Sequence, residues 1–474
     1  MNSIDIQSLS IDTLVSLIAQ GQLTSEQVTE HYIAEIKAIN PKINALVRQA
    51  DFDELRAQAK AADEAVKNGE SLGRLHGIPL SIKDMCKVKG FNCTLGTLGL
   101  KDFVADTDAT IVARLKQEGA LILGITNTPE LLMAFETDNL LYGRCNHPLD
   151  TDYSPGGSSG GEAALIGGGG SPAGMGSDSM GSVRVPSSYC GIAGLKVTQG
   201  RLPQTGRVPE EGAGLHVRSA SYGPMGRYVD DVALLLDITH GPDGIDPNSP
   251  PVLLNNYREV DLAALSVAWY DDNGISTPDA EVKAAIAKAA DKLGGKTKSC
   301  EWARPDCLDQ VEALALETIA FGADAGRSWA NGAKLLGTKE NSPLFDAFLT
   351  AAQSCDISLT EMRGRLRTWD KYNFTMNAFS EKYDITLCPV TPTTAFKHTE
   401  SSKNIRQFTY TMAYSLTGQP VATVNIGNDS RGFPIGIQIV GRLWCEHQVL
   451  AVAKYLENTL GGYQLTRKSL EKAS

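Results

Sequence analysis

Two serines and one lysine stand out in this chain because together they could carry out acyl transfer. Ser158 and Ser182 lie 24 residues apart in a glycine-rich stretch, residues 154–194. Lys83 follows the short apolar run GIPLSI, which is typical of a buried strand. A serine hydroxyl becomes a nucleophile when a base takes its proton, and a neutral lysine can be that base. The three residue types therefore predict a nucleophile, a relay and a base.

Lys83 alone is open to two interpretations. Burial disfavours the charged ammonium and would lower the lysine pKa by several units, which suits a catalytic base. A lysine that extends from a strand end into solvent would keep an ordinary pKa. The neighbouring Asp84 could also pair with Lys83 and raise its pKa. The assignment of Lys83 as a base therefore depends on the two serines.

The segment around Ser182, GSDSMGSVR at 176–184, predicts a turn with backbone N–H groups beside the hydroxyl. Four of these groups could converge on an oxyanion: those of Ser179, Met180, Gly181 and Ser182. Asp178 and Arg184 flank the turn. Because a guanidinium and a carboxylate can form two parallel hydrogen bonds, we expect this pair to be a structural ion pair that holds the loop.

The segment GGSSGG at 156–161 permits a different catalytic interpretation. It contains the pattern G-x-S-x-G twice, as does the nucleophile elbow of α/β-hydrolases, which works with a histidine and an acid. That elbow needs a strand immediately before it, whereas the preceding residues, NHPLDTDYSP, have the composition of a loop. A Walker-type phosphate loop is excluded because no Gly-Lys-Ser/Thr follows. A Ser–His–acid triad is therefore the alternative to Ser–Ser–Lys.

The elements that must position these residues alternate between helix and strand. This alternation predicts an α/β fold, with a large mixed central β-sheet covered by helices on both faces. The predicted helices start after Thr24 and after Pro278, cover 51–69, 109–117 and 229–241, and close the chain from about Glu446. The predicted strands end at Lys83 and cover 121–126, 265–270, 384–390, 421–427 and 435–441.

Residues 303–383 are predicted to be mostly helical and rich in aromatic side chains. Those considered are Phe321, Trp329, Phe345, Phe348, Trp369, Tyr372 and Phe374. They could pack in the core, which is the simpler interpretation, or they could line an apolar pocket for an acyl group. The sequence does not separate these two uses.

Length and charge narrow the class of protein. The chain has 474 residues, enough for one large α/β domain or two smaller ones. Its net charge of −11 argues against a nucleic-acid or anionic-membrane surface. No run of about 18 apolar residues could span a bilayer, and the N-terminal residues predict an amphipathic helix instead of a signal peptide. We therefore expect a cytoplasmic protein that acts on a small molecule.

Cysteine and histidine usage predicts neither a disulfide framework nor a zinc site. The nine cysteines are an odd number, and no Cys-x-x-Cys pair occurs among them. The seven histidines are scattered, without a His-x-x-x-His pair. We expect the cysteines to be small buried apolar residues, and we expect no metal and no organic cofactor.

Taken together, these motifs resemble the amidase signature family, whose members use a Ser–cis-Ser–Lys triad. The stretch from residue 154 to residue 198 matches the family's signature segment and is most similar to its fatty acid amide hydrolase members. Four further segments match: GPMGR at 223–227, the strand and turn at 384–392, SLTGQP at 415–420 and FPIGIQIVGR at 433–442. The resemblance covers nearly the whole chain and implies one amidase domain over 1–474. Within it we expect a signature core at about 70–240 and a more variable, helical specificity region at about 303–383.

Transferred residue by residue, the resemblance implies that Lys83 is the base and that Ser182 is the nucleophile. It implies that Ser158 is a relay on a cis peptide bond, with Ser159 as a supporting hydrogen-bond partner. One departure concerns the residues before the nucleophile, where the family has Gly-Gly-Ser and this chain has Met180-Gly181-Ser182. Met180 can still donate its backbone N–H if its backbone angles suit a residue with a side chain. We expect Met180 to affect the size of the accepted substrate or the catalytic rate, and not the mechanism. Two smaller departures, Ile125 and Val197, are expected to have small effects.

We therefore expect an amidase that hydrolyses a linear carboxamide or acyl amide through an acyl-enzyme on Ser182. The main alternative is the A subunit of a tRNA-dependent amidotransferase, which works within a heteromer. Such proteins carry a Ser-Leu-Asp-Gln-Ile-Gly segment, whereas residues 218–223 here read RSASYG and lack the Asp-Gln pair. A catalytically silent binding protein is a third hypothesis, and the intact Lys83, Ser158 and Ser182 argue against it. A homodimer is left open.

Overall fold

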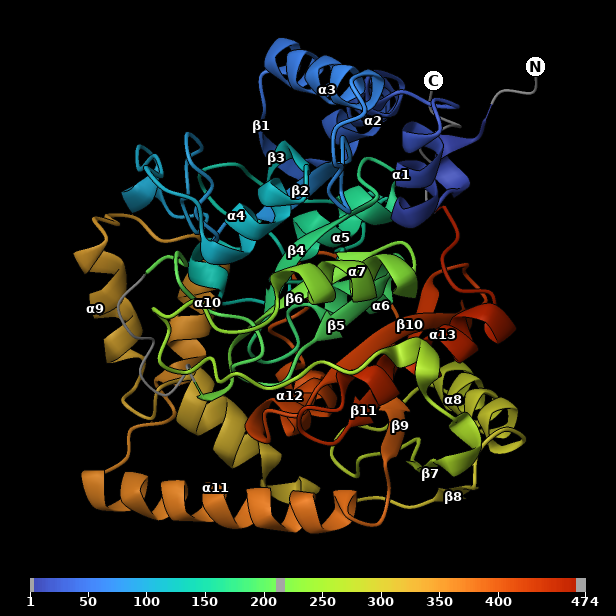
Figure 1. The fold of residues 1–474 in the computed structure, drawn as a ribbon. Helices are drawn as coiled ribbons and strands as arrows, with labels where there is room; N and C mark the ends of the chain where they lie inside the picture. Colours follow the sequence, from blue (N-terminus) through green and yellow to red (C-terminus); the bar gives the residue numbers. More distant parts are fainter. Residues whose placement is uncertain (1–3, 210–217, 466–474) are drawn as a thin grey trace.

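A computed structural model describes residues 4–209 and 218–465 of the chain. Eleven strands form one mixed sheet in the order β1-β3-β2-β4-β6-β5-β10-β11-β9-β7-β8, and helices surround it (Figure 1). The strands are β1 (Leu46–Gln49), β2 (Pro79–Lys83), β3 (Leu121–Thr126), β4 (Ala173–Asp178), β5 (Ala193–Lys196), β6 (Ser221–Gly226), β7 (Ser266–Trp269), β8 (Ser299–Trp302), β9 (Ile385–Pro389), β10 (Val421–Asn428) and β11 (Pro434–Gly441). The predicted α/β class with a large mixed sheet is confirmed.

The helices connect these strands and also form a layer of their own beyond the sheet. They are α1 (Ile11–Ala19), α2 (Ser25–Ile43), α3 (Phe52–Lys67), α4 (Thr110–Gln117), α5 (Gly160–Gly167), α6 (Arg184–Cys190), α7 (Val229–Thr239), α8 (Ala280–Gly294), α9 (Arg327–Leu335), α10 (Pro343–Ala352), α11 (Leu359–Ser380), α12 (Thr409–Leu416) and α13 (Glu446–Leu460). In Figure 1, α11 lies at the bottom of the view, opposite α2 and α3 at the top, and α9 and α10 lie between them on the left. None of the helices in the described ranges combines the length and the hydropathy that a bilayer crossing requires.

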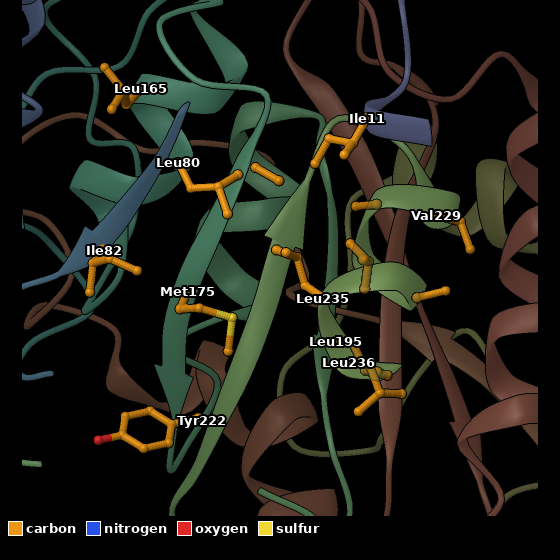
Figure 2. Packing of buried hydrophobic residues seen from close by; sticks show 14 of the residues in the cluster. Ile11, Leu80, Ile82, Leu165, Met175, Leu195, Tyr222, Val229, Leu235 and Leu236 are labelled. Atoms are coloured by element: carbon orange, nitrogen blue, oxygen red, sulfur yellow. The ribbon is translucent and has the colours of Figure 1, made fainter. Parts of the chain in front are cut away.

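The middle of the sheet is sandwiched between helices α5 and α7. Side chains alternate between the faces of a strand, so adjacent residues of β4 point to opposite helices. Gly174 of β4 faces α5, whereas Ala173 and its partner Gly226 of β6 face α7. Figure 2 shows the apolar side chains of β2, β4 and α7 in this core, Leu80, Met175 and Leu235 among them. Burial on both faces explains why β2 and β3 read as continuous apolar runs.

The sequence signals for several elements are confirmed by the structure. Thr24 caps α2 with the reciprocal capping-box bonds to Gln27. The helix predicted over 51–69 is α3, and that predicted over 109–117 is α4. The glycine after α4, Gly119, has a φ of +89°, the left-handed conformation that a residue after a helix end often adopts. These elements have strong local signals, because caps and left-handed turns depend on few residues.

The strands not expected from the sequence include three central ones, β4, β5 and β6. β4, AGMGSD, and β6, SYGPMG, contain glycine or proline, which usually indicate turns. β6 nevertheless lies between β4 and β5, and Pro224 stands opposite Met175 in its antiparallel ladder with β4. In β4 the small residues are needed for packing. A Cβ atom at Gly174 would lie 2.0 Å from the Glu162 carboxylate of α5. Tertiary packing therefore overrides the local signal here.

The aromatic residues between 303 and 383 divide between the two predicted uses. Trp369 and Tyr372 of α11 are buried and donate hydrogen bonds to backbone carbonyls of α12, at Leu416 and Ala413. Phe345 is also buried in the core. Phe374 is exposed, while Phe321, Trp329 and Phe348 line a cavity that is described below. The region is mostly helical as predicted, although Glu312–Ala320 (η8) forms a π-helix.

Candidate active site

Lys83 is the last residue of β2, and its ammonium nitrogen lies among three serine hydroxyls. The Nζ–Oγ distances are 2.8 Å to Ser158, 2.9 Å to Ser159 and 3.0 Å to Ser177. The fold explains this arrangement. β2 and β4 are parallel, so Lys83 lies at the same edge of the sheet as Ser177. α5 runs back toward the start of β4, which brings the serines before α5 to that edge.

The hydrogen bonds around Lys83 restrict where its protons can go. The Ser159 hydroxyl donates to the Ser177 carbonyl oxygen at 3.2 Å, so it can only accept from Lys83. A neutral amine has two N–H donors and one lone pair, and it has three hydroxyl neighbours here. One hydroxyl must therefore donate its proton to the nitrogen. Ser158 and Ser177 are the two that can do so.

The environment favours a neutral lysine. The Lys83 side chain is fully buried, and burial lowers its pKa from 10.5 to about 7. The carboxylates of Asp178 and Glu162 partly offset this effect, and the Arg207 guanidinium adds to it. Asp84 does not pair with Lys83. Its carboxylate accepts hydrogen bonds from Thr94 and from Gly96 N, so the pairing with Lys83 that the sequence left open is not made.

The loop that carries Ser158 enters α5 directly. The Gly157–Ser158 peptide bond is cis, as the resemblance implied. Ser159 then precedes the first residue of α5, Gly160, and its N–H donates to the Ser182 carbonyl at 3.1 Å. This bond joins the two serine-bearing turns, which are 24 residues apart in the sequence. No strand precedes Ser158, so the nucleophile-elbow geometry of the alternative interpretation is absent from this described part of the chain.

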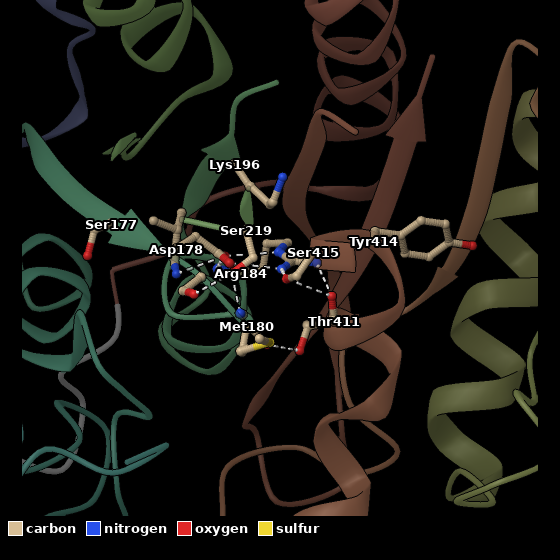
Figure 3. Close-up of polar contacts among 12 residues, drawn as sticks. Ser177, Asp178, Met180, Arg184, Lys196, Ser219, Thr411, Tyr414 and Ser415 are labelled. Atoms are coloured by element: carbon tan, nitrogen blue, oxygen red, sulfur yellow. Dashed lines mark hydrogen bonds and ion pairs between the residues drawn. The ribbon is translucent and has the colours of Figure 1, made fainter. Parts of the chain in front are cut away.

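Asp178 and Arg184 form the predicted ion pair beneath the second turn. Both side chains are fully buried, and two parallel bonds of 2.8 and 2.9 Å join them. Burial raises the pKa of the Asp178 carboxyl, but the Arg184 charge and hydrogen bonds bring it down to about 2. Arg184 also donates to the Thr411 carbonyl and to Ser415 on α12 (Figure 3). The ion pair therefore links the turn after β4 to α12.

The turn itself is shaped by Asp178. This carboxylate accepts from the Gly181 N–H at 2.8 Å and from the Val183 N–H at 3.1 Å. Gly181 has a φ of +130°, and a Cβ atom there would lie 2.4 Å from Thr411 Oγ1, so only glycine fits. The Thr411 hydroxyl donates to the Met180 carbonyl at 2.6 Å and holds the other side of the turn.

These contacts change the set of candidate oxyanion donors. The Gly181 N–H was expected to be one of four, but it already donates to Asp178. Among the described residues, the N–H groups of Met180 and Ser182 have no acceptor. Met180 also lacks a positive φ, so its side chain causes no backbone strain. Met180 and Ser182 are therefore the best-placed donors of the predicted set, with Ser179 beside them on the cavity wall.

Ser182 lies between β4 and α6 and is partly exposed. Its hydroxyl makes no hydrogen bond within the described ranges, and it lines a cavity of about 560 Å³. Ser158, Ser177, Ser179 and Met180 line the same cavity. The structure thus brings the three predicted catalytic residues together at this cavity. Ser158 and Ser182 line it, and the buried Lys83 contacts Ser158 from the protein interior.

The rest of the cavity is mainly apolar. Its lining comes from η3 (Glu130–Leu132), from the residues after it, from η8, and from α9, α10 and α12. The apolar lining includes Leu131, Met133, Phe135, Ile319, Phe321, Trp329, Leu336, Phe348 and Met412. A cavity of this size and lining suits a small molecule with an extended hydrocarbon part.

Two residues at the site were not found from the sequence. Ser177 completes the set of hydroxyls around Lys83, but a lone serine in a glycine-rich segment gave no signal. Glu162 lies buried in α5, where its carboxylate accepts from Ser81 of β2 and from Thr126 of β3, the latter at 2.8 Å. Burial raises the Glu162 pKa to about 7. Glu162 follows the signature serines closely, and that position was its only available signal.

In the described parts of the chain, no three histidine, cysteine or acidic side chains are grouped so that they could hold a metal ion. All nine cysteines lie in those parts, and no disulfide links any two of them. Only Cys300 and Cys445 are partly exposed.

The chain is similar to known proteins in both sequence and fold. A family model described as Amidase matches residues 27–450. An acylamidase of Rhodococcus erythropolis is 32% identical over 483 residues, which covers 96% of each chain. The A subunit of the glutamyl-tRNA(Gln) amidotransferase of Acinetobacter baumannii (strain AB0057) is 29% identical over 489 residues, covering 96% of this chain and 97% of that one. A solved structure of fatty acid amide hydrolase superposes with a TM-score of 0.84 at 25% identity, covering 96% of this chain and 86% of that one.

Proposed function

Because this chain belongs to the amidase family, as its signature segment predicted, we propose that it hydrolyses a carboxamide through a covalent acyl-enzyme on Ser182. Family membership supports amide hydrolysis. The observation that carries the mechanism is the buried Lys83, whose amine lies 2.8 Å from the Ser158 hydroxyl. A lysine with a pKa of about 7 is neutral in a large fraction of molecules at neutral pH, so it can accept a proton.

In the first step, the neutral Lys83 amine takes the Ser158 proton while the Ser158 oxygen takes the proton of Ser182. The Ser182 oxygen then bonds to the amide carbonyl carbon. Two backbone donors, Met180 N–H and Ser182 N–H, face the developing oxyanion. In the second step, Ser158 returns a proton to the leaving nitrogen and the C–N bond breaks. Water then attacks the acyl-enzyme by the reverse route and releases the carboxylic acid.

The Asp178–Arg184 pair acts as a support in this mechanism. It holds the Gly181 N–H and thereby sets the direction of the neighbouring donors. Electrostatic stabilisation of an oxyanion depends on donors that are already oriented before the reaction. Ser159 and Ser177 have a similar role on the other side, because they fix the Lys83 amine against Ser158.

The cavity supports a substrate with an apolar part, and we propose an open-chain amide. The helical region at about 303–383 supplies η8, α9 and α10 to the cavity wall, which supports its assignment as the specificity region of a single amidase domain. The acidic net charge of −11 argues against a nucleic-acid partner, and the nine thiol side chains suit the reducing cytoplasm. A homodimer is compatible with these features.

The purified chain tested alone separates this proposal from the amidotransferase hypothesis. The similarity to an amidotransferase A subunit keeps that hypothesis under test, and the missing Asp-Gln pair at 218–223 argues against it. We expect acid and amine release from acyl amides and anilides of graded chain length, and little ammonia release from glutamine. A matched lactam should react more slowly than its open-chain amide. Glutamine as the best substrate, or activity only when partner proteins are added, would overturn the proposal.

Met180→Gly tests where this chain differs from the family pattern. The Met180 side chain is 7% exposed, packs in an apolar cluster and lines the cavity beside Ser182. Its removal makes room near the reacting carbonyl. We therefore expect kcat/KM for anilides with branched acyl groups to rise about tenfold relative to acetanilide. Steady-state kinetics on a graded series of acyl anilides would measure this ratio.

The matched control for this variant is Met412→Ala. Met412 lies on α12, lines the same cavity and belongs to the same apolar cluster, but it is far from the turn in sequence. Its truncation should favour large substrates without changing the response to branching next to the carbonyl. If Met180→Gly instead lowered kcat/KM by the same factor for all substrates, the methionine would only keep the turn rigid.

A further inference from the structure

One wall of the cavity contains polar atoms that the rest of the protein leaves unsatisfied. Gln204 Nε2, Arg207 Nε and Ser221 Oγ are each buried, and none has a hydrogen-bond partner among the described residues. All three residues line the cavity that contains Ser182. Each of the three atoms can donate a hydrogen bond. Buried donors without partners are uncommon in folded proteins, because an unsatisfied polar group costs free energy.

Arg207 is the charged member of this group. It forms no ion pair with any carboxylate of the described residues, and its one side-chain hydrogen bond is a 3.5 Å contact from Nη1 to Gln204 Oε1. Arg207 is half-buried, and the fully buried arginines elsewhere differ from it in their partners, although Arg201 Nε and Arg227 Nε also lack a hydrogen-bond partner among the described residues. Arg184 and Arg201 each pair with a buried carboxylate, and Arg227 donates to two backbone carbonyls. The Arg207 guanidinium is half-buried on the wall of an apolar cavity and has no carboxylate partner among the described residues, so it is positioned to bind an anion.

The backbone places this wall at the catalytic end of the cavity. Arg207 forms a β-bridge with Cys86, just beyond the end of β2, and Val208 N donates to the Met85 carbonyl at 2.9 Å. Ser221 is the first residue of β6 and stands opposite Asp178, the last residue of β4. Arg207 and Ser221 thus lie beside the two strand ends that carry Lys83 and the Ser182 turn, and Gln204 contacts Arg207. A group bound there would lie near the reacting amide.

We propose that Arg207, with Gln204 and Ser221, binds a carboxylate of the substrate, so that the enzyme prefers amides with an anionic group near the scissile bond. This inference rests on the proposed amidase function. A guanidinium offers two parallel N–H donors to a carboxylate, and the amide and hydroxyl complete the acceptor's remaining sites. The apolar remainder of the cavity takes the hydrocarbon part. Substrates of this class include N-acyl amino acids and the monoamides of dicarboxylic acids.

Two pairs of substrates of matched shape test the proposal. N-octanoylglycine is compared with N-isobutyloctanamide, which places the carboxylate or its apolar replacement on the amine side. Succinic monoamide is compared with 4-methylpentanamide, which does the same on the acyl side. In at least one pair we expect kcat/KM to favour the carboxylate by about 10- to 100-fold, as for hydrogen bonds to a charged group. The pair that responds identifies the side of the amide that carries the anion.

Arg207→Gln should bring the carboxylate-to-neutral ratio in that pair close to one. The ratio is the measured quantity because the Arg207 charge also acts on Lys83, and an effect on the base is common to both substrates. Arg207→Lys should keep part of the preference. The matched control is Arg218→Gln, since Arg218 lies in the same segment but pairs with Asp370 and stacks on Trp369. That control should leave the ratio unchanged.

Binding without turnover provides a second measurement. Succinate should bind wild-type protein in calorimetry and should raise its melting temperature, and Arg207→Gln should lose both effects while remaining folded. The inference is overturned if the wild type prefers the neutral amide in both pairs. It is also overturned if Arg207→Gln and Arg218→Gln change the ratio equally. Labelling of Ser182 by a fluorophosphonate reports the catalytic serine independently, so failure of this inference is distinguishable from failure of the amidase function.

Discussion

Replacing Ser182 by alanine is expected to abolish amide hydrolysis, because Ser182 is the proposed site of the acyl bond. Loss of a nucleophile that acts as a unit with its base lowers kcat by about 10⁴- to 10⁶-fold in comparable serine hydrolases. Ser182 lies at the cavity surface, so the exchange removes one oxygen and should leave the fold intact. Initial rates on an acyl anilide, with the melting temperature as a folding check, measure the effect.

A fluorophosphonate probe gives the direct test of this assignment. Mass spectrometry should find the probe on Ser182 in the wild type and no labelled serine in Ser182→Ala. The matched control is Ser159→Ala, because Ser159 also contacts Lys83 but donates its proton to the Ser177 carbonyl. This control should retain labelling at Ser182 with reduced activity. A label on Ser159 in the wild type would instead favour the α/β-hydrolase interpretation.

Lys83→Met should lower kcat/KM on the order of 10³-fold or more at neutral pH, the upper part of the range for general-base catalysis. Methionine matches the length of the lysine stem and suits a fully buried position. The exchange therefore removes the base and leaves the packing in place. The same variant should react slowly with the fluorophosphonate, because Ser182 loses the group that finally accepts its proton.

The pH dependence of kcat/KM tests whether Lys83 acts as a base. Lys83 acts as a base only when it is neutral, and burial lowers its pKa to about 7. In the wild type, kcat/KM should therefore rise about tenfold per pH unit below pH 7 and level off above about pH 8. In Lys83→Met this rise should disappear from the residual activity. A rise at the same pH in the variant would assign the titration to another group.

Lys196→Met is the matched control for the lysine. Lys196 on β5 is also fully buried, and burial also lowers its pKa to about 7, but it donates to the Gln419 carbonyl and to no serine hydroxyl of the described residues. This exchange should change activity far less than Lys83→Met. None of the described residues that line the cavity is a histidine. A histidine-to-alanine exchange that removes activity from a folded protein would therefore contradict the Ser–Ser–Lys assignment.

The residues of the candidate site could be predicted because their signals are local. Ser158 and Ser182 stand in glycine-rich turns, and Lys83 ends an apolar run, so residue type suggested grouping them, and the resemblance to the amidase signature family supplied the role of each. The Asp178–Arg184 pair followed from two opposite charges that flank a short turn. Strands such as β3 and helices such as α4 were found for the same reason. Each depends mainly on its own residues.

What could not be predicted depends on contacts between segments that are distant in the sequence. Ser177 joins the lysine only because β4 lies parallel to β2. The Gly181 N–H is lost as an oxyanion donor because the Asp178 carboxylate turns toward it. The aromatic residues of the 303–383 region look alike in the sequence, and only the packing of α9 and α10 against the cavity separates Trp329 and Phe348 from the core residues.

The contact between Gly174 and Glu162 has a consequence for how this enzyme can evolve. The Glu162 carboxylate is hydrogen bonded to both β2 and β3, and a single methyl group at Gly174 would collide with it. A change at Glu162 would not relieve the second collision, because the same Cβ atom would lie 2.3 Å from the Ser81 backbone oxygen of β2. Gly174 is therefore closed to substitution while β2 and β4 keep this spacing. The apolar side chains of η8, α9 and α10 touch the substrate cavity without contacting this network. New substrate preferences can therefore arise there by single steps, while the chemistry is inherited unchanged.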